Sequence, residues 1–264
     1  MVNSESIFNY SLFGNSWLVA IALNTILLGV TFPLLKKLLT TGGIFHAWIL
    51  GVIIWGSLNW QGYLIVTFYF LVGSGVTRIG LKQKEAAGIA EKRSGARGPE
   101  NVWGSALIGT ICALLTLIPG EISGKSAWFL PSLLLLGYVA SFSTKLSDTC
   151  ASEVGKVYGK RTFLITTFQP VAKGTEGAVS LEGTLAGVIA SAAIACLAWG
   201  IGLINFNGVI ICIIAAFIAT NLESIIGATL QSKYSWLTNE IVNIINTLIG
   251  AIVAILLAWI FLKN

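Results

Sequence analysis

The chain has 264 residues, of which 55% are hydrophobic and only 10% are charged, with a net charge of +5. A soluble domain carries roughly 25% charged residues, so this chain cannot cover a globular surface with ionised side chains. The composition therefore excludes a soluble enzyme, a nucleic-acid-binding module and a disordered chain. Long apolar runs separated by short polar stretches are typical of a polytopic helical membrane protein.

The apolar runs predict an all-α fold: one integral membrane domain over residues 1–264, built as a bundle of about eight transmembrane helices. The spans are expected near 14–35, 42–58, 61–78, 103–119, 127–147, 182–203, 207–228 and 239–262. Only residues 58–61 separate the second span from the third, and only 204–206 separate the sixth from the seventh, which predicts two tight hairpins. Two longer segments, near 79–102 and 148–181, are predicted to be cytoplasmic loops.

The basic residues predict the orientation of these spans. All lysines and arginines except Lys125 and Lys263 fall on one side of the eight-span arrangement. By the positive-inside rule this side is cytoplasmic and both termini lie outside. No Lys or Arg precedes the first apolar run, so the first span is expected to be retained rather than cleaved as a signal peptide.

A polar stripe runs along the fifth span where it is predicted to leave the membrane. Ser141, Lys145, Asp148 and Ser152 have the spacing of residues on one face of a helix, and Thr144 flanks them. Because Mg²⁺ favours carboxylate, hydroxyl and phosphate oxygens, the stripe indicates a magnesium and phosphate site. The alternative is an interfacial ion pair at a solvated helix end.

The seventh span contains a carboxylate among apolar residues. An ionised Glu223 is costly in hydrocarbon, so we expect it to face the bundle interior and meet a cation or metal ion, with Asn221 about half a turn away. The alternative is a neutral glutamate whose hydrogen bonds fix helix packing.

The eighth span begins with Asn239 and Glu240, and positions 239, 243, 246 and 250 form one stripe along it. Hydrogen bonds between helices would explain the amides Asn243 and Asn246 without catalysis. Glu240 lies at the predicted cytoplasmic end and instead favours a site.

The segment 170–184 leads into the sixth span with Lys173, Thr175, Glu176, Glu182 and Thr184. Its glycines permit a tight backbone, and the N-terminus of the following helix offers free N–H groups to an anion. The alternative role of the glutamates is to complement the helix dipole.

The basic segment 78–101 could bind anionic lipid headgroups, which is the commonest role of such clusters. Arg97 stands between Gly95 and Gly98, however, and an arginine there suits a backbone bent around a phosphate.

Several other features of the sequence do not indicate a functional site. The segment 120–126 resembles a Walker A loop but is one residue short and follows no strand. His46 and Asn24 are interpreted as packing residues. The four cysteines form no CxxC motif and the single histidine has no nearby partner, so we expect neither a disulfide framework nor a zinc site.

Three segments resemble the phytyl-phosphate kinase family, which includes the transmembrane protein 19 group. They are residues 145–156, 173–184 and 223–228, and the similarity continues at 84–88, 97–99 and 238–243. Several long motifs in the right order, over about residues 70–250, make the resemblance specific, whereas residues 1–70 carry no recognised motif. The family is more remotely similar to the CTP-using phytol and dolichol kinases.

The resemblance implies a membrane kinase that transfers the terminal phosphoryl group of a nucleoside triphosphate to a prenyl monophosphate such as phytyl phosphate. CTP is the expected donor, and the diphosphate product serves tocopherol and phylloquinone synthesis in the plant and cyanobacterial members. The expected location is a bacterial inner or thylakoid membrane, with the active site on the cytoplasmic face. The expected partners are the two substrates and membrane lipid, without nucleic acid, and a homo-oligomer is left open.

This reaction assigns roles to the candidate residues. Magnesium is expected on the carboxylates Asp148, Glu153, Glu182, Glu223 and Glu240. The catalytic set is Asp148 with the cations Lys145, Lys173 and Arg97, which would hold the triphosphate or the acceptor phosphate. Nucleotide binding is expected from Thr175, Glu176, Thr184, Asn221, Asn239 and Asn243.

Two other classes compete with the kinase. A small-solute or lipid transporter would suit glycine-rich spans, but it should gather ionisable groups near the bilayer midplane, whereas most lie at one face here. A lipid-binding scaffold would not need carboxylates opposite cations.

Overall fold

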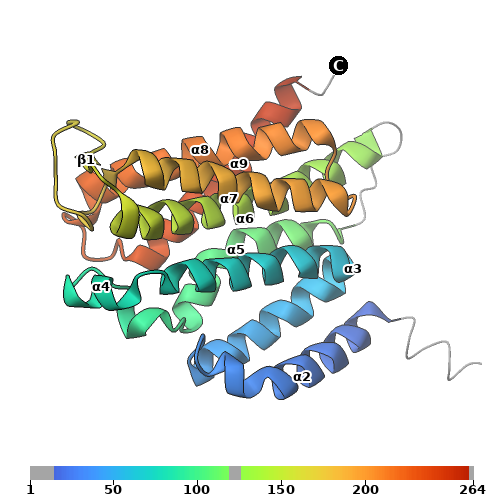
Figure 1. Cartoon of the computed structure of the whole chain (residues 1–264). Coiled ribbons are helices and arrows are strands. Elements are labelled where there is room, and N and C mark those ends of the chain that lie inside the picture. The colour runs from blue at the N-terminus through green and yellow to red at the C-terminus, as the bar shows by residue number, and fades with distance from the viewer. Residues whose placement is uncertain (1–14, 119–125, 262–264) are drawn as a thin grey trace, which may run out of the picture.

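A computed structural model describes residues 15–118 and 126–261, and the side chains of 126–129 are not described. The helices are α2 (Ser16–Leu35), α3 (Thr41–Arg78), α4 (Leu81–Ala86), α5 (Pro99–Leu115), α6 (Ser126–Tyr158), α7 (Leu181–Gly200), α8 (Phe206–Ile226) and α9 (Asn239–Phe261), with the short helical turns η1 (Lys92–Gly95) and η2 (Gly227–Gln231). Two-residue strands β1 (Phe163–Leu164) and β2 (Ala178–Val179) pair antiparallel in the segment between α6 and α7. The expected all-α membrane bundle is confirmed (Figure 1).

Five helical segments among the described residues are long and apolar enough to cross a membrane. They are Ser16–Leu35, Thr41–Arg78, Leu181–Gly200, Phe206–Gln231 and Asn239–Phe261. The other two long helices differ: α5 has 17 residues, and α6 has 33 but contains charged residues in its second half. The count of eight spans therefore stays a prediction.

The predicted break at 58–61 is present inside α3. Asn59 has non-helical backbone angles, with a φ of 52° and a ψ of −155°, and it divides α3 into two arms. The ring centroids of Trp55 and Tyr63 lie 5.3 Å apart across this break, so the chain turns back on itself. Figure 1 shows the two arms as separate rods that meet at one end.

Helix α6 is the centre of the bundle. It packs against α3, α5, α7, α8 and α9, and every residue from 136 to 150 is buried. Glycines on α9 and α7 let the backbones of these two helices approach α6 closely. A Cβ added to Gly250 of α9 would lie 2.1 Å from Oγ1 of Thr144, and one added to Gly187 of α7 would lie 2.9 Å from Oγ of Ser147.

The described helices correct two predicted boundaries. Helix α6 continues past the predicted end at 147 to Tyr158, so the first part of the expected loop 148–181 is helical. Helix α5 begins at Pro99 rather than near 103, because proline suits the first turn of a helix, where its missing N–H has no partner to lose. The remaining loops are consequently shorter and fold against the bundle.

The packing roles expected for two polar residues are confirmed. His46 accepts a hydrogen bond from the Trp103 indole at 2.9 Å and joins α3 to α5. Asn24 is fully buried in α2 and accepts a hydrogen bond from the Tyr63 hydroxyl at 3.0 Å. The four cysteines are free, and the Walker-like segment lies mostly outside the described residues.

The glycine contacts around α6 generate a stability prediction. Gly250→Ala should lower the stability by about 1–3 kcal/mol, because the new methyl group must push Thr144 away in a tightly packed interface. Thermal unfolding in detergent measures the change. The matched control is Gly29→Ala in α2, where a Cβ meets nothing within 4 Å. Equal melting temperatures for both variants would contradict this description of the interface.

Candidate functional site

A polar cavity of about 460 Å³ lies at one end of the bundle. The C-terminal half of α6 lines it, together with the ends of α3 and α8 and the beginnings of α5, α7 and α9. Residues 88–97 and 173–179, from the two long polar segments, complete the wall. We call this space the polar cavity.

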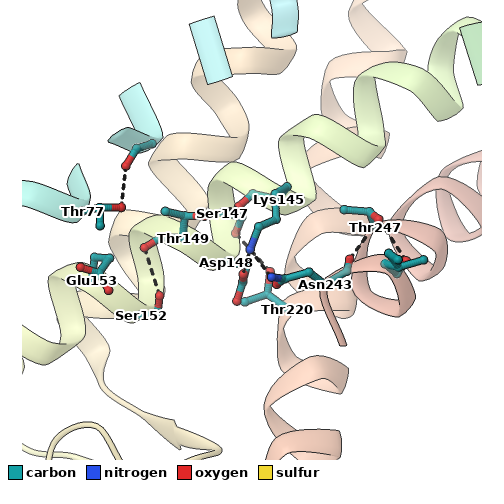
Figure 2. A network of polar contacts seen from close by, with 12 residues as sticks. Thr77, Lys145, Ser147, Asp148, Thr149, Ser152, Glu153, Thr220, Asn243 and Thr247 are labelled. Carbon is teal, nitrogen blue, oxygen red and sulfur yellow. Dashed lines mark hydrogen bonds and ion pairs between the residues drawn. The ribbon is translucent and has the colours of Figure 1, made fainter. Parts of the chain in front are cut away.

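An ion pair on α6, which also contacts α9, lines the cavity. Lys145 and Asp148, one turn apart on α6, have Nζ and Oδ2 2.6 Å apart. Lys145 also donates to Oδ1 of Asn243 on α9 at 2.7 Å (Figure 2). The pair is nearly buried, at 9% and 12% side-chain exposure, so it is not the solvated interfacial pair that was the alternative reading. Enclosed charges interact strongly with a further ion because little water screens them.

A second charge network joins the basic segment to α6. Glu153 is buried and forms ion pairs with Lys84 of α4 and with Lys156, the latter at 3.0 Å. Lys84 also donates to the carbonyl oxygen of Thr77 at 2.7 Å. Two lysines therefore already neutralise Glu153, which makes it a weaker candidate for a metal ligand than the other carboxylates.

Glu91 extends this network from the loop before η1. Its carboxylate lies 3.2 Å from Nζ of Lys156. Partial burial acts to raise the pKa of Glu91, but the nearby charges of Lys156, Lys145 and Arg97 outweigh it and hold the pKa below its ordinary value. The pair thus persists from neutral into weakly acidic solution and is lost only as the pH falls through that lowered pKa.

Arg97 is fixed at the cavity wall by both its backbone and its side chain. Its N–H and C=O pair with Leu38 and Thr40 next to α3, at 2.9 and 3.0 Å. Its guanidinium donates to the Tyr69 hydroxyl at 2.8 Å and lies over the rings of Tyr69 and Phe70. Because guanidinium has five N–H donors, most of them remain for an anion in the cavity.

Three carboxylates of the cavity, Glu176, Glu223 and Glu240, form no ion pair with any described residue. Glu223 of α8 and Glu176 of the loop before β2 both line it, and Glu223 lies within electrostatic range of Asp148, Lys145 and Glu176. No group of three or more His, Cys, Asp or Glu among the described residues is arranged as a ready-made metal site. Mg²⁺ typically uses only one or two carboxylates and completes its shell with water and substrate phosphates, so this donor set fits it.

The structure brings almost the whole predicted site together. The predicted residues that line the polar cavity are Arg97, Lys145, Asp148, Glu153, Lys173, Thr175, Glu176, Thr184, Asn221, Glu223, Asn239, Glu240 and Asn243. The exception is Glu182. Ser180 caps α7 by accepting from the Gly183 N–H at 3.1 Å, and a Cβ on Gly183 would meet α6. Glu182 precedes Gly183 by one residue, about 100° around the helix, and lies outside the lining.

Four functional candidates escaped the sequence analysis. They are Glu91, Lys156, Tyr69 and Asn101, all of which line the cavity. Lys156 could have been found, because it lies three residues after Glu153 on the same helix. Asn101, whose amide donates to Glu240 at 3.4 Å, and Tyr69 depend on contacts between distant segments that no local pattern indicates.

The fold and this site define an integral membrane protein with a charged cavity at one end of its helix bundle. Residues 24–251 match the family of integral membrane proteins known as DUF92, and the chain belongs to that family. The match confirms the family resemblance drawn from the sequence motifs. No solved structure matches the chain.

Three relatives illustrate this membership. An uncharacterized membrane protein of Synechocystis is 65% identical over 90% of both chains. The chloroplastic protein VTE6 of Arabidopsis thaliana is 44% identical over 94% of this chain and 74% of its own. An uncharacterized membrane protein of Methanocaldococcus jannaschii is 31% identical over 91% and 95%.

The buried network generates a prediction about stability. Lys84→Met should lower the stability by about 3–5 kcal/mol, because it removes one partner of a buried charge. Thermal unfolding in detergent measures the loss, and Lys92→Met, on an exposed residue of the same segment, should leave the melting temperature unchanged. A Lys84→Met protein as stable as the wild type would contradict the assigned pairing.

Proposed function

We propose that the protein is a membrane kinase that transfers the terminal phosphoryl group of a nucleoside triphosphate to a prenyl monophosphate. The observation that carries the proposal is the convergence of cations and carboxylates from the three helices α6, α8 and α9 and from both long polar segments in one cavity at one end of the bundle. The relationship to VTE6 and the family resemblance support the same reaction. We further propose CTP as the donor, phytyl phosphate as an acceptor and tocopherol and phylloquinone synthesis as the use of the product.

The chemistry requires positioning and charge neutralisation more than a strong base. An oxygen of the acceptor phosphate is already anionic near neutral pH. It attacks the terminal phosphorus of the nucleoside triphosphate as the bond from that phosphorus to the leaving nucleoside diphosphate breaks. Lys145, Lys173 and Arg97 would hold the two phosphate groups against their mutual repulsion. In this scheme Asp148 keeps the Lys145 ammonium in place and in its charged form.

Magnesium is part of the proposal. When bound, it would neutralise charge on the transferring phosphates and hold them in line. Asp148 and Glu223 are the strongest candidates to hold it, followed by Glu176 and Glu240, all from the cavity wall. Glu153 is already paired with two lysines and Glu182 lies outside the cavity, so we assign neither of them to the metal.

A transporter remains the second candidate. A transporter places its ionisable groups near the bilayer midplane, where alternating access occurs. Here the charges line a cavity at the helix ends, beside both long polar segments, which favours an enzyme that works at a membrane surface. The basic residues of those segments predict that this surface is the cytoplasmic one.

Activity of the purified protein tests the proposal. With phytyl monophosphate, Mg²⁺ and CTP labelled in its terminal phosphate, wild-type protein should form labelled phytyl diphosphate. Asp148→Asn should lower kcat by about 100-fold or more, because it releases the Lys145 ammonium and removes a metal ligand. The control is Glu182→Gln, outside the cavity, which should retain wild-type kcat.

Three results would contradict the proposal. They are full turnover by a folded Asp148→Asn protein, equal losses in both variants, and no product from the wild type with any nucleotide or prenyl phosphate. Solute flux in liposomes together with the last result would favour the transporter.

A further inference from the structure

The polar cavity does not end at the charged residues but continues between two membrane helices. Its lining includes Gly187 and Val188 of α7 and Phe217, Thr220 and Asn221 of α8. Val188 lies seven residues beyond the first residue of α7, which is about 10 Å along the helix axis. Helix α7 has 20 residues and is long and apolar enough to span the hydrocarbon core, which is about 30 Å thick. If α7 spans this core, Val188 lies at a depth at which lipid tails are found.

The walls become apolar along this extension. Val188 is only partly buried and Phe217 is 47% exposed, although both line the cavity. Leu185 and Ile189 continue the same surface of α7 outward, at 53% and 69% exposure. The same opening is therefore polar at the helix ends and apolar where it meets the lipid.

The floor of this opening is built from small residues of the central helix. Gly187 lies so close to α6 that a Cβ would come within 3.0 Å of the Ser147 carbonyl oxygen, and Ser147 accepts a hydrogen bond from Thr220 at 3.4 Å. Figure 2 shows Thr220 below Asp148, so the opening begins next to the Lys145–Asp148 ion pair. Bulky residues in the floor would have closed it.

The other described walls of the cavity contribute no exposed apolar side chain from a membrane-length helix. Tyr69 of α3 is buried, and its hydroxyl accepts a hydrogen bond from Arg97. Helix α9 contributes only Asn239, Glu240 and Asn243. Among the described residues, the crevice between α7 and α8 therefore connects the charged part of the cavity to the surface that faces the lipid.

We propose that the crevice between α7 and α8 is the binding groove for the hydrocarbon tail of the lipid acceptor. The tail lies between Val188 and Phe217, while its phosphate remains beside Lys145. This inference rests on the proposed function for the identity of the acceptor, and it makes Val188 and Phe217 determinants of tail specificity.

Photo-crosslinking tests the groove without requiring turnover. Wild-type protein in nanodiscs is irradiated with geranylgeranyl monophosphate that carries a diazirine in its second isoprene unit, and the labelled peptides are identified by mass spectrometry. The expected label falls within 184–189 or 217–221, and excess unlabelled geranylgeranyl monophosphate should remove it. Label confined to other helices, or no competable label, would overturn the proposal.

Kinetics of two variants provide the second test. Val188→Trp should raise KM for geranylgeranyl monophosphate at least about tenfold by filling the groove, and leave KM for the nucleotide unchanged. Ile252→Trp adds similar bulk to the exposed surface of α9, outside the cavity lining, and should leave both constants unchanged. Equal effects of the two variants, or an unchanged lipid KM in Val188→Trp, would overturn the groove while leaving the kinase proposal intact.

The two proposals can fail separately. If the wild type phosphorylates no prenyl phosphate, the proposed function fails and the crosslinking pattern alone decides the groove. If it phosphorylates them and the label falls elsewhere, the groove fails and the function stands.

Discussion

The buried Lys145–Asp148 ion pair lies on the helix that five other long helices contact, and those helices must enclose it. Removing two charges from water costs several kcal/mol for each ion, and the mutual attraction offsets this only with good geometry and further hydrogen bonds. The pair has both, because the two residues lie one turn apart on α6 and Asn243 supplies an additional oxygen to Lys145. The five long helices around α6 enclose the pair from the sides and leave it open toward the cavity.

The neighbours of the polar helix α6 can enclose it closely only where they carry small residues at the points of contact. Gly187 and Gly250 bring α7 and α9 against Ser147 and Thr144, and this close packing replaces the hydrophobic driving force that is absent between helices in lipid. The same small residues leave room beside α6 for the crevice that opens toward α8. The same glycines therefore account for the tight packing and for the space beside α6 in which we propose that the lipid tail binds.

The sequence predicted the membrane helices, the break near Asn59 and most of the site, because hydrophobic run length and helical spacing are local properties. Asp148 and Lys145 were found in this way, since their spacing alone places them together on one face of a helix. The sequence did not indicate that Glu182 lies outside the cavity lining, because its residue type says nothing about helix phase, which the cap at Ser180 fixes. Glu91 could not be found, because the path of its loop depends on left-handed residues such as Gly88 and on a contact with a helix 65 positions later.

The central claim is that one cavity holds the nucleotide and the lipid phosphate side by side. Phosphorus NMR of phytyl monophosphate bound to the protein in nanodiscs tests it, with Mn²⁺ in place of Mg²⁺ and a non-hydrolysable CTP analogue. We predict that adding the analogue in the presence of Mn²⁺ broadens the lipid phosphorus resonance beyond the effect of Mn²⁺ alone, and that the analogue adds no such broadening in nanodiscs without protein. A bound lipid phosphate whose resonance is unchanged by saturating Mn²⁺ and analogue would contradict the account.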